Sequence, residues 1–151
     1  DSGSSTVSNL SVNGSVSKVS GSFCIPHPLP AMNDTHKLYH SFIEGPRADL
    51  IYRGSVNLVN GSATVNIDHH SDMTDGTFEA LNRNVDCFTT NETDWDPVRG
   101  TVHGNILRIE CQNPSSTAKV SWMVVGERQD EGMRDTHWTD STGRVVPEKL
   151  K

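Results

Sequence analysis

The segment DHHSDMTDG, residues 68–76, has the side-chain types of a metal site. Its candidate ligands are His69, His70, Asp72 and Asp75, and imidazole and carboxylate groups are common metal ligands. Neighbouring residues on an extended backbone point to opposite sides, however, so the two histidines do not readily share one ion. We interpret the segment as a polar loop whose side chains bond within the protein, and we expect no metal. A metal held between symmetry-related copies is the alternative.

Other arrangements that support catalysis or metal binding are missing from the sequence. His36 and His40 have the four-residue spacing of a helical metal pair, but they lie in a segment that we expect to be extended. The chain contains no nucleophile elbow of the GxSxG type and no phosphate-binding glycine loop before a helix. Its carboxylates do not lie in stretches apolar enough to raise their pKa for acid catalysis. We therefore expect a non-enzymatic protein without a cofactor.

Four aromatic side chains are candidates for contact with a partner, because large amphipathic aromatic residues dominate the energy of many binding surfaces. One of them lies in the acidic segment NETDWDP, residues 91–97, where a tryptophan either stacks on a sugar or packs onto its own or a neighbouring domain. Another lies in the polar C-terminal segment, where it can also anchor that segment to the body. The four residues are Tyr39, Tyr52, Trp95 and Trp138.

Length and composition indicate one β-rich domain. The chain has 151 residues, of which 33% are hydrophobic and 6% aromatic. This composition is typical of a β-protein with many turns, one that can gain part of its burial from neighbouring copies. A net charge of −6 argues against nucleic acid as a partner, because phosphate backbones require a basic face. No apolar run is long enough to span a bilayer, so we expect no membrane insertion.

The segment KVSWMVVGERQD, residues 119–130, predicts a central β-strand. Its apolar residues occupy both alternating sets of positions between 120 and 125, so both faces of the extended segment are largely apolar. Such a strand is expected in the middle of a β-structure, with protein on each side. Gly126 ends the apolar run, and the charged residues after it return the chain to water.

Two β-hairpins are predicted from turn residues between alternating apolar positions. The first spans residues 55–68 and turns at Asn60-Gly61, because both residues tolerate positive φ. The second spans residues 98–111 and turns at Gly104-Asn105. Further predicted elements are an edge strand at 23–30 that continues as a proline-rich arm, a strand at 38–44, a strand at 50–52 that Gly54 interrupts, a short helix at 78–81, a strand from Val85, and a last edge strand at 145–146.

The cysteine and sequon patterns leave alternatives open. Cys24, Cys87 and Cys111 are widely spaced and contain no zinc-type pair. We interpret them as small buried apolar side chains, with one disulfide and a spare thiol as the alternative. Five Asn-x-Ser/Thr sequons matter only for a protein that passes through a eukaryotic secretory pathway; they begin at Asn9, Asn13, Asn33, Asn60 and Asn91.

Two phrases stand out as specific: HSFIEGPRADLIYRG, residues 40–54, and VSWMVVGERQD, residues 120–130. With these phrases, the chain from residue 20 to residue 151 resembles a module of bacteriophage tail-fibre and related virion appendage proteins. The resemblance implies a homotrimeric, β-rich, extracellular appendage in which a repetitive shaft often precedes the module. Nothing in the chain resembles the long C-terminal helices of the self-cleaving chaperone domain found in some of these proteins, so proteolysis is not implied. The resemblance carries over no catalytic or binding residues.

These observations together predict an all-β fold, an antiparallel β-sandwich or jelly-roll-like domain over residues 23–151. Residues 1–22 are expected to form an extended linker or the end of a shaft. The expected function is a structural or receptor-binding domain of a phage or virus tail fibre, acting as a homotrimer at the host surface. Its expected partners are further copies, other virion proteins and a host cell-surface receptor, with glycans among the candidates. A carbohydrate-binding module and a secreted cell-adhesion domain are the alternatives.

Overall fold

The computed structural model describes residues 9–19, 21–26, 30–41 and 44–150. The chain divides into two compact units, residues 1–44 and residues 45–151. The boundary suggested by the sequence, between residues 22 and 23, falls inside the first unit. Residues 9–19 form no helix or strand.

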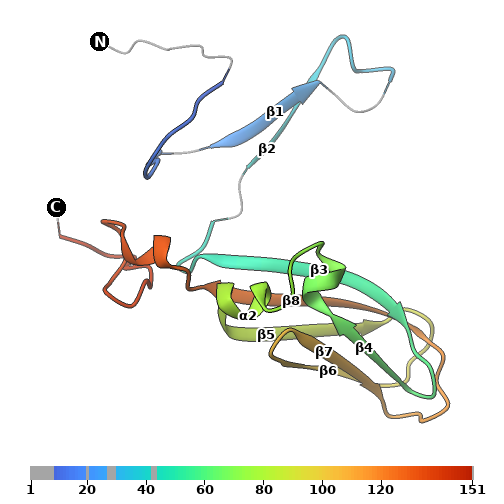
Figure 1. Ribbon diagram of the computed structural model, residues 1–151. Helices are drawn as coiled ribbons and strands as arrows, with labels where there is room; N and C mark the ends of the chain where they lie inside the picture. Colours follow the sequence, from blue (N-terminus) through green and yellow to red (C-terminus); the bar gives the residue numbers. More distant parts are fainter. Residues whose placement is uncertain (1–8, 20, 27–29, 42–43, 151) are drawn as a thin grey trace, which may run out of the picture. The chain divides into compact units, whose positions relative to one another are not determined.

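The first unit contains one antiparallel pair of strands (Figure 1). β1 (Ser22–Pro26) pairs with β2 (Lys37–Ser41), so both strands are edge strands, which suits the proline at the end of β1. A turn precedes β2, where the carbonyl of Met32 accepts a hydrogen bond from the backbone N–H of His36 at 2.9 Å. The strands expected in this region are confirmed over these bounds. The proline-rich arm falls partly on residues 27–29, which lie outside the described residues.

The second unit contains two antiparallel sheets of three strands each (Figure 1). The order in the first sheet is β3 (Asp49–Asn57), β8 (Lys119–Arg128), β5 (Asn82–Asn91). The order in the second sheet is β4 (Ser62–Asn66), β7 (Ile106–Cys111), β6 (Val98–His103). The helices are short: α1 (Ile67–His70), α2 (Thr77–Leu81), which confirms the expected short helix, and the 3₁₀ helix η1 (Glu131–Arg134). The expected all-β class is confirmed.

Buried side chains from both sheets and both α-helices form one core. β8 contributes Val120, Trp122 and Val124, which are at most 3% exposed. The other buried members of the core are Leu58, Ile67, Phe78, Leu107, Ile109 and Ala118. Because one face of β8 reaches this cluster with every second residue, β8 links the first sheet to the interior of the second unit.

β8 is the central strand of its sheet, as the sequence predicted, but only one of its faces is covered. It pairs along its length with β3 on one side and β5 on the other. Its second face carries Ser121, Met123 and Val125, which are half-buried or exposed. The prediction of protein on each side of this strand therefore holds for one side only among the described residues.

The predicted hairpin at residues 55–68 is wrong in its pairing, although its turn is present. Asn60 and Gly61 have positive φ angles of 49° and 72°, and a single bridge joins Val59 to Ser62. Beyond that bridge the flanking strands separate, because β3 pairs with β8 and β4 pairs with β7. Hydrogen bonds to other segments draw the turn into the fold: Leu58 N–H donates to the carbonyl of Ala118, and Gly61 N–H to that of Ser116. The turn residues correctly predicted the bend, but the strands on either side of it pair with strands from elsewhere in the sequence.

The predicted hairpin at residues 98–111 is confirmed. β6 and β7 pair in one register from Val98 opposite Cys111 to His103 opposite Ile106. Gly104 in the turn has a φ of +58°, a left-handed conformation that glycine adopts without a steric penalty. Here the strand partner is also the neighbour in sequence, so the local signal was sufficient.

Gly54 does not interrupt a strand, as the sequence suggested, but lies inside β3. A Cβ atom at this position would lie 2.6 Å from His70 Nε2 and 2.7 Å from Trp122 Cζ2. The missing side chain therefore makes room for two rings that pack edge-to-face, with centroids 4.9 Å apart.

We expect Gly54→Ala to lower the free energy of unfolding by about 1–3 kcal/mol, because the added methyl group must displace the rings of His70 and Trp122. Urea denaturation at neutral pH measures this change. Gly45→Ala is the control, since the nearest atom to its Cβ is a carbonyl oxygen 3.9 Å away. Equal stability of the two variants would contradict this account of Gly54.

Candidate functional site

The metal-like segment at residues 68–76 is organised around a buried carboxylate. Asp68 lies in α1 and has no exposed surface. Its carboxylate accepts hydrogen bonds from Gly76 N–H and Phe78 N–H, both at 2.7 Å, and from Asn105 Nδ2 at 2.9 Å. These bonds tie α1 to the start of α2 and to the turn between β6 and β7. The segment was expected to be a loop, but it begins as a short helix, because Asn66 caps α1 by accepting from His69 N–H.

The two histidines of this segment have different partners. His69 Nε2 lies 3.8 Å from Asp75 Oδ1, while His70 Nε2 is hydrogen-bonded to the carbonyl of Arg53 at 3.2 Å. Side-chain hydrogen bonds from Asn66 and Asn105 lower the pKa of Asp75. Among the described residues, no group of three His, Cys, Asp or Glu side chains is placed to hold a metal ion. The hydrogen bonds of the segment are those of a structural junction.

We expect Asp68→Asn to lower the free energy of unfolding by about 2–4 kcal/mol, because its amide group would face backbone N–H donors and leave a buried bond unmade. Urea denaturation measures the loss. Asp72→Asn is the control: Asp72 is exposed and has a φ of 55°, which asparagine also tolerates. Addition of a chelator should leave both curves unchanged. A metal role would be indicated if the chelator lowered the stability of the unmodified protein.

Trp95 is the most exposed aromatic residue of the described chain. Its side chain is 101% exposed, at the tip of the loop between β5 and β6. The structure thus excludes, within the described residues, that Trp95 packs onto its own domain, which was one of the two options read from the sequence. The indole is therefore accessible to a partner, and tryptophan is a residue type that is enriched at binding surfaces.

Hydrogen bonds give the Trp95 loop a defined shape. Asn91 Oδ1 accepts from Thr93 N–H and Asp94 N–H, and Asn91 Nδ2 donates to Asp94 Oδ1 at 2.6 Å. Asp94 Oδ1 also accepts from Asp96 N–H. Asn91 begins a sequon, and its amide is already used, so a glycan there would displace a bond that shapes the loop. Because these hydrogen bonds already order the backbone that carries the indole, the loop loses little conformational entropy when it binds a partner.

The other predicted contact residues are placed differently. Tyr52 is half-buried and points into the core: its ring meets Phe78 edge-to-face at 4.9 Å, and its hydroxyl accepts from Asn82 Nδ2. This placement argues against a direct contact role for Tyr52. Tyr39 lies in β2, opposite Cys24, and its side chain is outside the described residues. Within the second unit, Tyr52 in the core and Trp95 on its exposed loop therefore do not form one site.

Trp138 is half-buried in the C-terminal segment, which folds back on itself after η1. A bridge joins Thr139 to Val145, and Trp138 C=O accepts from Val146 N–H at 2.9 Å. Only this bridge forms where the sequence predicted a last edge strand. Met133, 2% exposed, is the buried apolar residue of this segment. The sequence pointed to Trp138 as the anchor and missed Met133.

Glu127 at the end of β8 joins the C-terminal segment to the first sheet. Its carboxylate, 8% exposed, accepts from Arg83 at 2.9 Å and from Asn84 at 2.7 Å, and Arg144 Nε lies 3.8 Å away. Asn84 has a φ of 49° where the register of β5 shifts, and this irregularity lets it reach Glu127. Burial raises the pKa of Glu127, but the bonds from Asn84 and Arg83 outweigh burial and lower it overall.

The lowered pKa of Glu127 predicts that acid weakens this junction. The ionised carboxylate stabilises the folded state above the unfolded value of about 4.5, and the contribution is lost as pH falls through the lower folded value. Glu127→Gln should therefore cost about 2–4 kcal/mol at neutral pH and flatten the fall in stability below about pH 5. Urea denaturation at several pH values measures both effects. Glu110→Gln, which removes exposed ion pairs, should cost less than about 1 kcal/mol.

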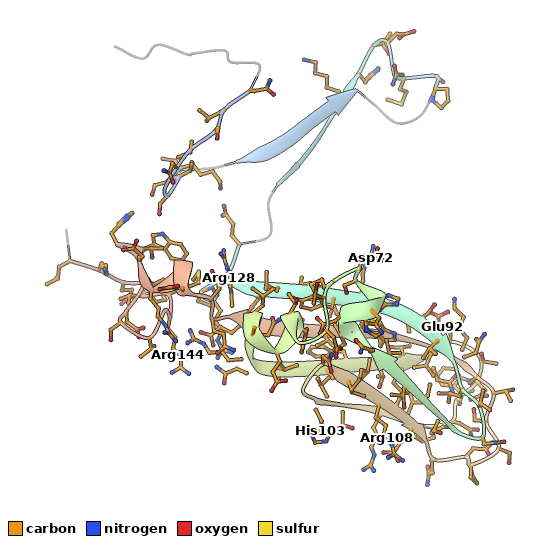
Figure 2. The ribbon with its side chains drawn as sticks, viewed as in Figure 1. Asp72, Glu92, His103, Arg108, Arg128 and Arg144 are labelled. Carbon is orange, nitrogen blue, oxygen red and sulfur yellow. The ribbon has the colours of Figure 1, made fainter. Side chains whose placement is uncertain are left out.

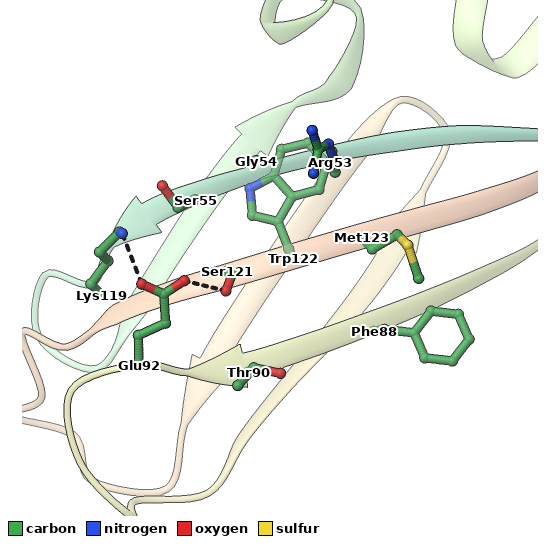
Figure 3. Close-up of a pocket in the computed structure, with 10 residues that line it drawn as sticks. All are labelled: Arg53, Gly54, Ser55, Phe88, Thr90, Glu92, Lys119, Ser121, Trp122 and Met123. Atoms are coloured by element: carbon green, nitrogen blue, oxygen red, sulfur yellow. Dashed lines mark hydrogen bonds and ion pairs between the residues drawn. The ribbon is translucent and has the colours of Figure 1, made fainter. Parts of the chain in front are cut away.

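The outer face of the first sheet is a second exposed surface. None of the four aromatic residues predicted from the sequence lies on it. Phe88 and Met123 lie side by side on it, 55% and 37% exposed (Figure 3). They border a shallow depression of about 590 Å³. At its other end, Glu92 forms an ion pair with Lys119 at 2.8 Å and accepts a hydrogen bond from Ser121. The alternation in residues 119–125, apolar on both faces, was the sequence signal for this surface.

The described cysteines are not paired. Cys87 and Cys111 are both free and half-buried, and burial raises the pKa of the Cys87 thiol, which makes it a poor nucleophile. This excludes a disulfide between these two residues. The side chain of Cys24 lies outside the described residues.

A comparison with known protein-family models and with curated proteins finds no match to this chain. The resemblance to tail-fibre modules therefore remains a prediction from the sequence. In the described part of the chain, no helix combines the length and the apolar character needed to cross a membrane.

Proposed function

We propose that the chain is a non-enzymatic structural and receptor-binding domain of a virion appendage, such as the tail fibre of a phage or virus. In this proposal the domain acts as a homotrimer outside the particle and attaches it to the host cell. The body at residues 45–151 is then an antiparallel β-sandwich formed by the two sheets. Its partners are further copies of the chain, other virion proteins and a host cell-surface receptor.

The observation that supports this proposal best is the exposure of Trp95 on its hydrogen-bonded loop. A large aromatic side chain held in water on a shaped loop is suited to contact, because it gains apolar burial at a small entropic cost. The loop also carries Asp94, whose carboxylate is used to shape the backbone. Each such site is small, so attachment requires several sites acting together.

A homotrimer supplies that multiplicity. Three linked copies convert the second and third contacts into intramolecular events, and the overall avidity exceeds the affinity of one site by orders of magnitude. Weak, shallow contacts such as a single indole then suffice for attachment.

We expect the unmodified chain to sediment at three times the 16.6 kDa mass of one chain at micromolar concentrations. Analytical ultracentrifugation measures the mass directly. A folded species of one chain across this range would contradict the homotrimer, and it would leave the binding role of Trp95 to be judged by the next experiment.

The second candidate function is a carbohydrate-binding module, and the same residue favours it, because an exposed indole stacks on the apolar face of a sugar ring. We expect Trp95→Ala to reduce binding to a printed glycan array by about tenfold or more. Val59→Ala is the control, since Val59 is 69% exposed on a different turn. Equal binding by the unmodified chain and the two variants, or no binding by the unmodified chain, would contradict the carbohydrate function.

A further inference from the structure

The outer face of the first sheet carries an apolar stripe across all three of its strands. The strand register places Ile51, Val125 and Asp86 in one row and Arg53, Met123 and Phe88 in the next. Ile51 is 48% exposed, Phe88 55% and Met123 37%. Four of the six side chains in these two rows are therefore apolar. The three exposed ones, Ile51, Met123 and Phe88, occupy adjacent positions on the face.

The second sheet has no such stripe on its outer face. The row through its centre consists of Thr64, Arg108 and Thr101, all exposed. Arg108 and the neighbouring exposed residue His103 project away from this sheet into solvent (Figure 2). A solvated sheet face normally looks like this one. The two three-stranded sheets therefore differ in their outer faces, and an exposed apolar patch such as that of the first sheet is typical of an interaction surface.

The charges beside the apolar stripe are of opposite sign and lie on opposite edges. Arg53 is on β3 and Asp86 is on β5, with β8 between them. Two strand spacings across the sheet and two residues along it separate the two backbone positions by about 12 Å, too far for an ion pair within one sheet. Neither side chain has an ion-pair partner among the residues that the structure describes. One edge thus offers a cation and the other edge an anion.

We propose that this face lines the threefold axis of the homotrimer, and that Arg53 of each copy meets Phe88 and Asp86 of the next copy. This inference rests on the proposed trimer. When strands run along a threefold axis, rotation keeps each residue at its level and brings the β3 edge of one copy beside the β5 edge of the next. Arg53 and Phe88 lie in the same row, and Asp86 is two residues, about 7 Å, along the strand.

A second copy of the chain fits this face because the two edges complement each other. Each copy brings one cation and one anion, so a closed ring pairs every Arg53 with an Asp86 and leaves no charge over. The guanidinium also reaches the ring of Phe88, where a cation gains further attraction. The Met123 side chains, in the central row, then meet at the axis and exclude water from it.

Met123→Glu tests the position of the axis. It should reduce the sedimenting mass at micromolar concentration to that of one chain, because three carboxylates would be buried together. Thr101→Glu is the matched control on the outer face of the second sheet, and it should leave the mass of three chains unchanged. Circular dichroism checks that each variant is folded. A folded Met123→Glu protein with the mass of three chains would overturn this inference and leave the homotrimer standing.

A charge exchange tests the contact itself and does not depend on Met123. Arg53→Asp and Asp86→Arg should each raise the concentration at which half of the trimer dissociates by about tenfold or more, because each creates a like-charge pair. The double variant should return close to the unmodified value. Arg108→Asp, on the outer face of the other sheet, is the control, and it should leave the concentration of half-dissociation unchanged.

The outcomes separate this inference from the proposed function. A trimer in which the double variant is no stronger than the single variants would show that Arg53 and Asp86 do not meet. An unmodified protein of one chain would remove the homotrimer, and this inference would fall with it.

Discussion

The second unit depends on β8 being buried on one face by its own chain. Val120, Trp122 and Val124 supply the apolar contacts that join the first sheet to the core, and both edges of β8 are hydrogen-bonded. Because side chains alternate along a strand, the register that buries these three residues necessarily places Ser121, Met123 and Val125 on the other side. The open face is therefore a consequence of the core. The sequence has made that face apolar as well, which the core does not require.

Much of the fold could be predicted from local patterns, and the failures share one cause. The β6–β7 hairpin formed as expected, because Gly104 lies between strands that pair with each other. The signal at Asn60-Gly61 was as clear, yet β3 and β4 belong to different sheets. A turn motif determines the local path of the chain. Which strands pair depends on hydrogen bonds and side-chain contacts with segments far away in the sequence, and the turn motif carries no information about these.

The candidate site was only partly readable for the same reason. Trp95 could be identified from its acidic surroundings, but its full exposure was not evident from the residue types around it. The polar segment at residues 68–76 suggested a metal, and its strongest feature, the burial of Asp68, depends on Gly76, Phe78 and Asn105. Two of these contacts join the carboxylate to backbone N–H groups of the next helix, and the third joins it to a side chain in a distant turn. Residue types alone do not distinguish a ligand cluster from a structural junction.

β5 connects the outer face of the first sheet to the loop that carries Trp95. Its outward-facing residue Phe88 belongs to the apolar stripe, with Asp86 beside it, and its last residue, Asn91, shapes the loop that carries Trp95. A threefold axis along the strands keeps the direction of β5 the same in every copy, so a trimer built on the stripe places three Trp95 loops at the same end. In the proposed function, three indoles at one end contact the host surface together, which is the geometry that avidity requires. Covering the apolar face and presenting the tryptophans are then two consequences of one assembly.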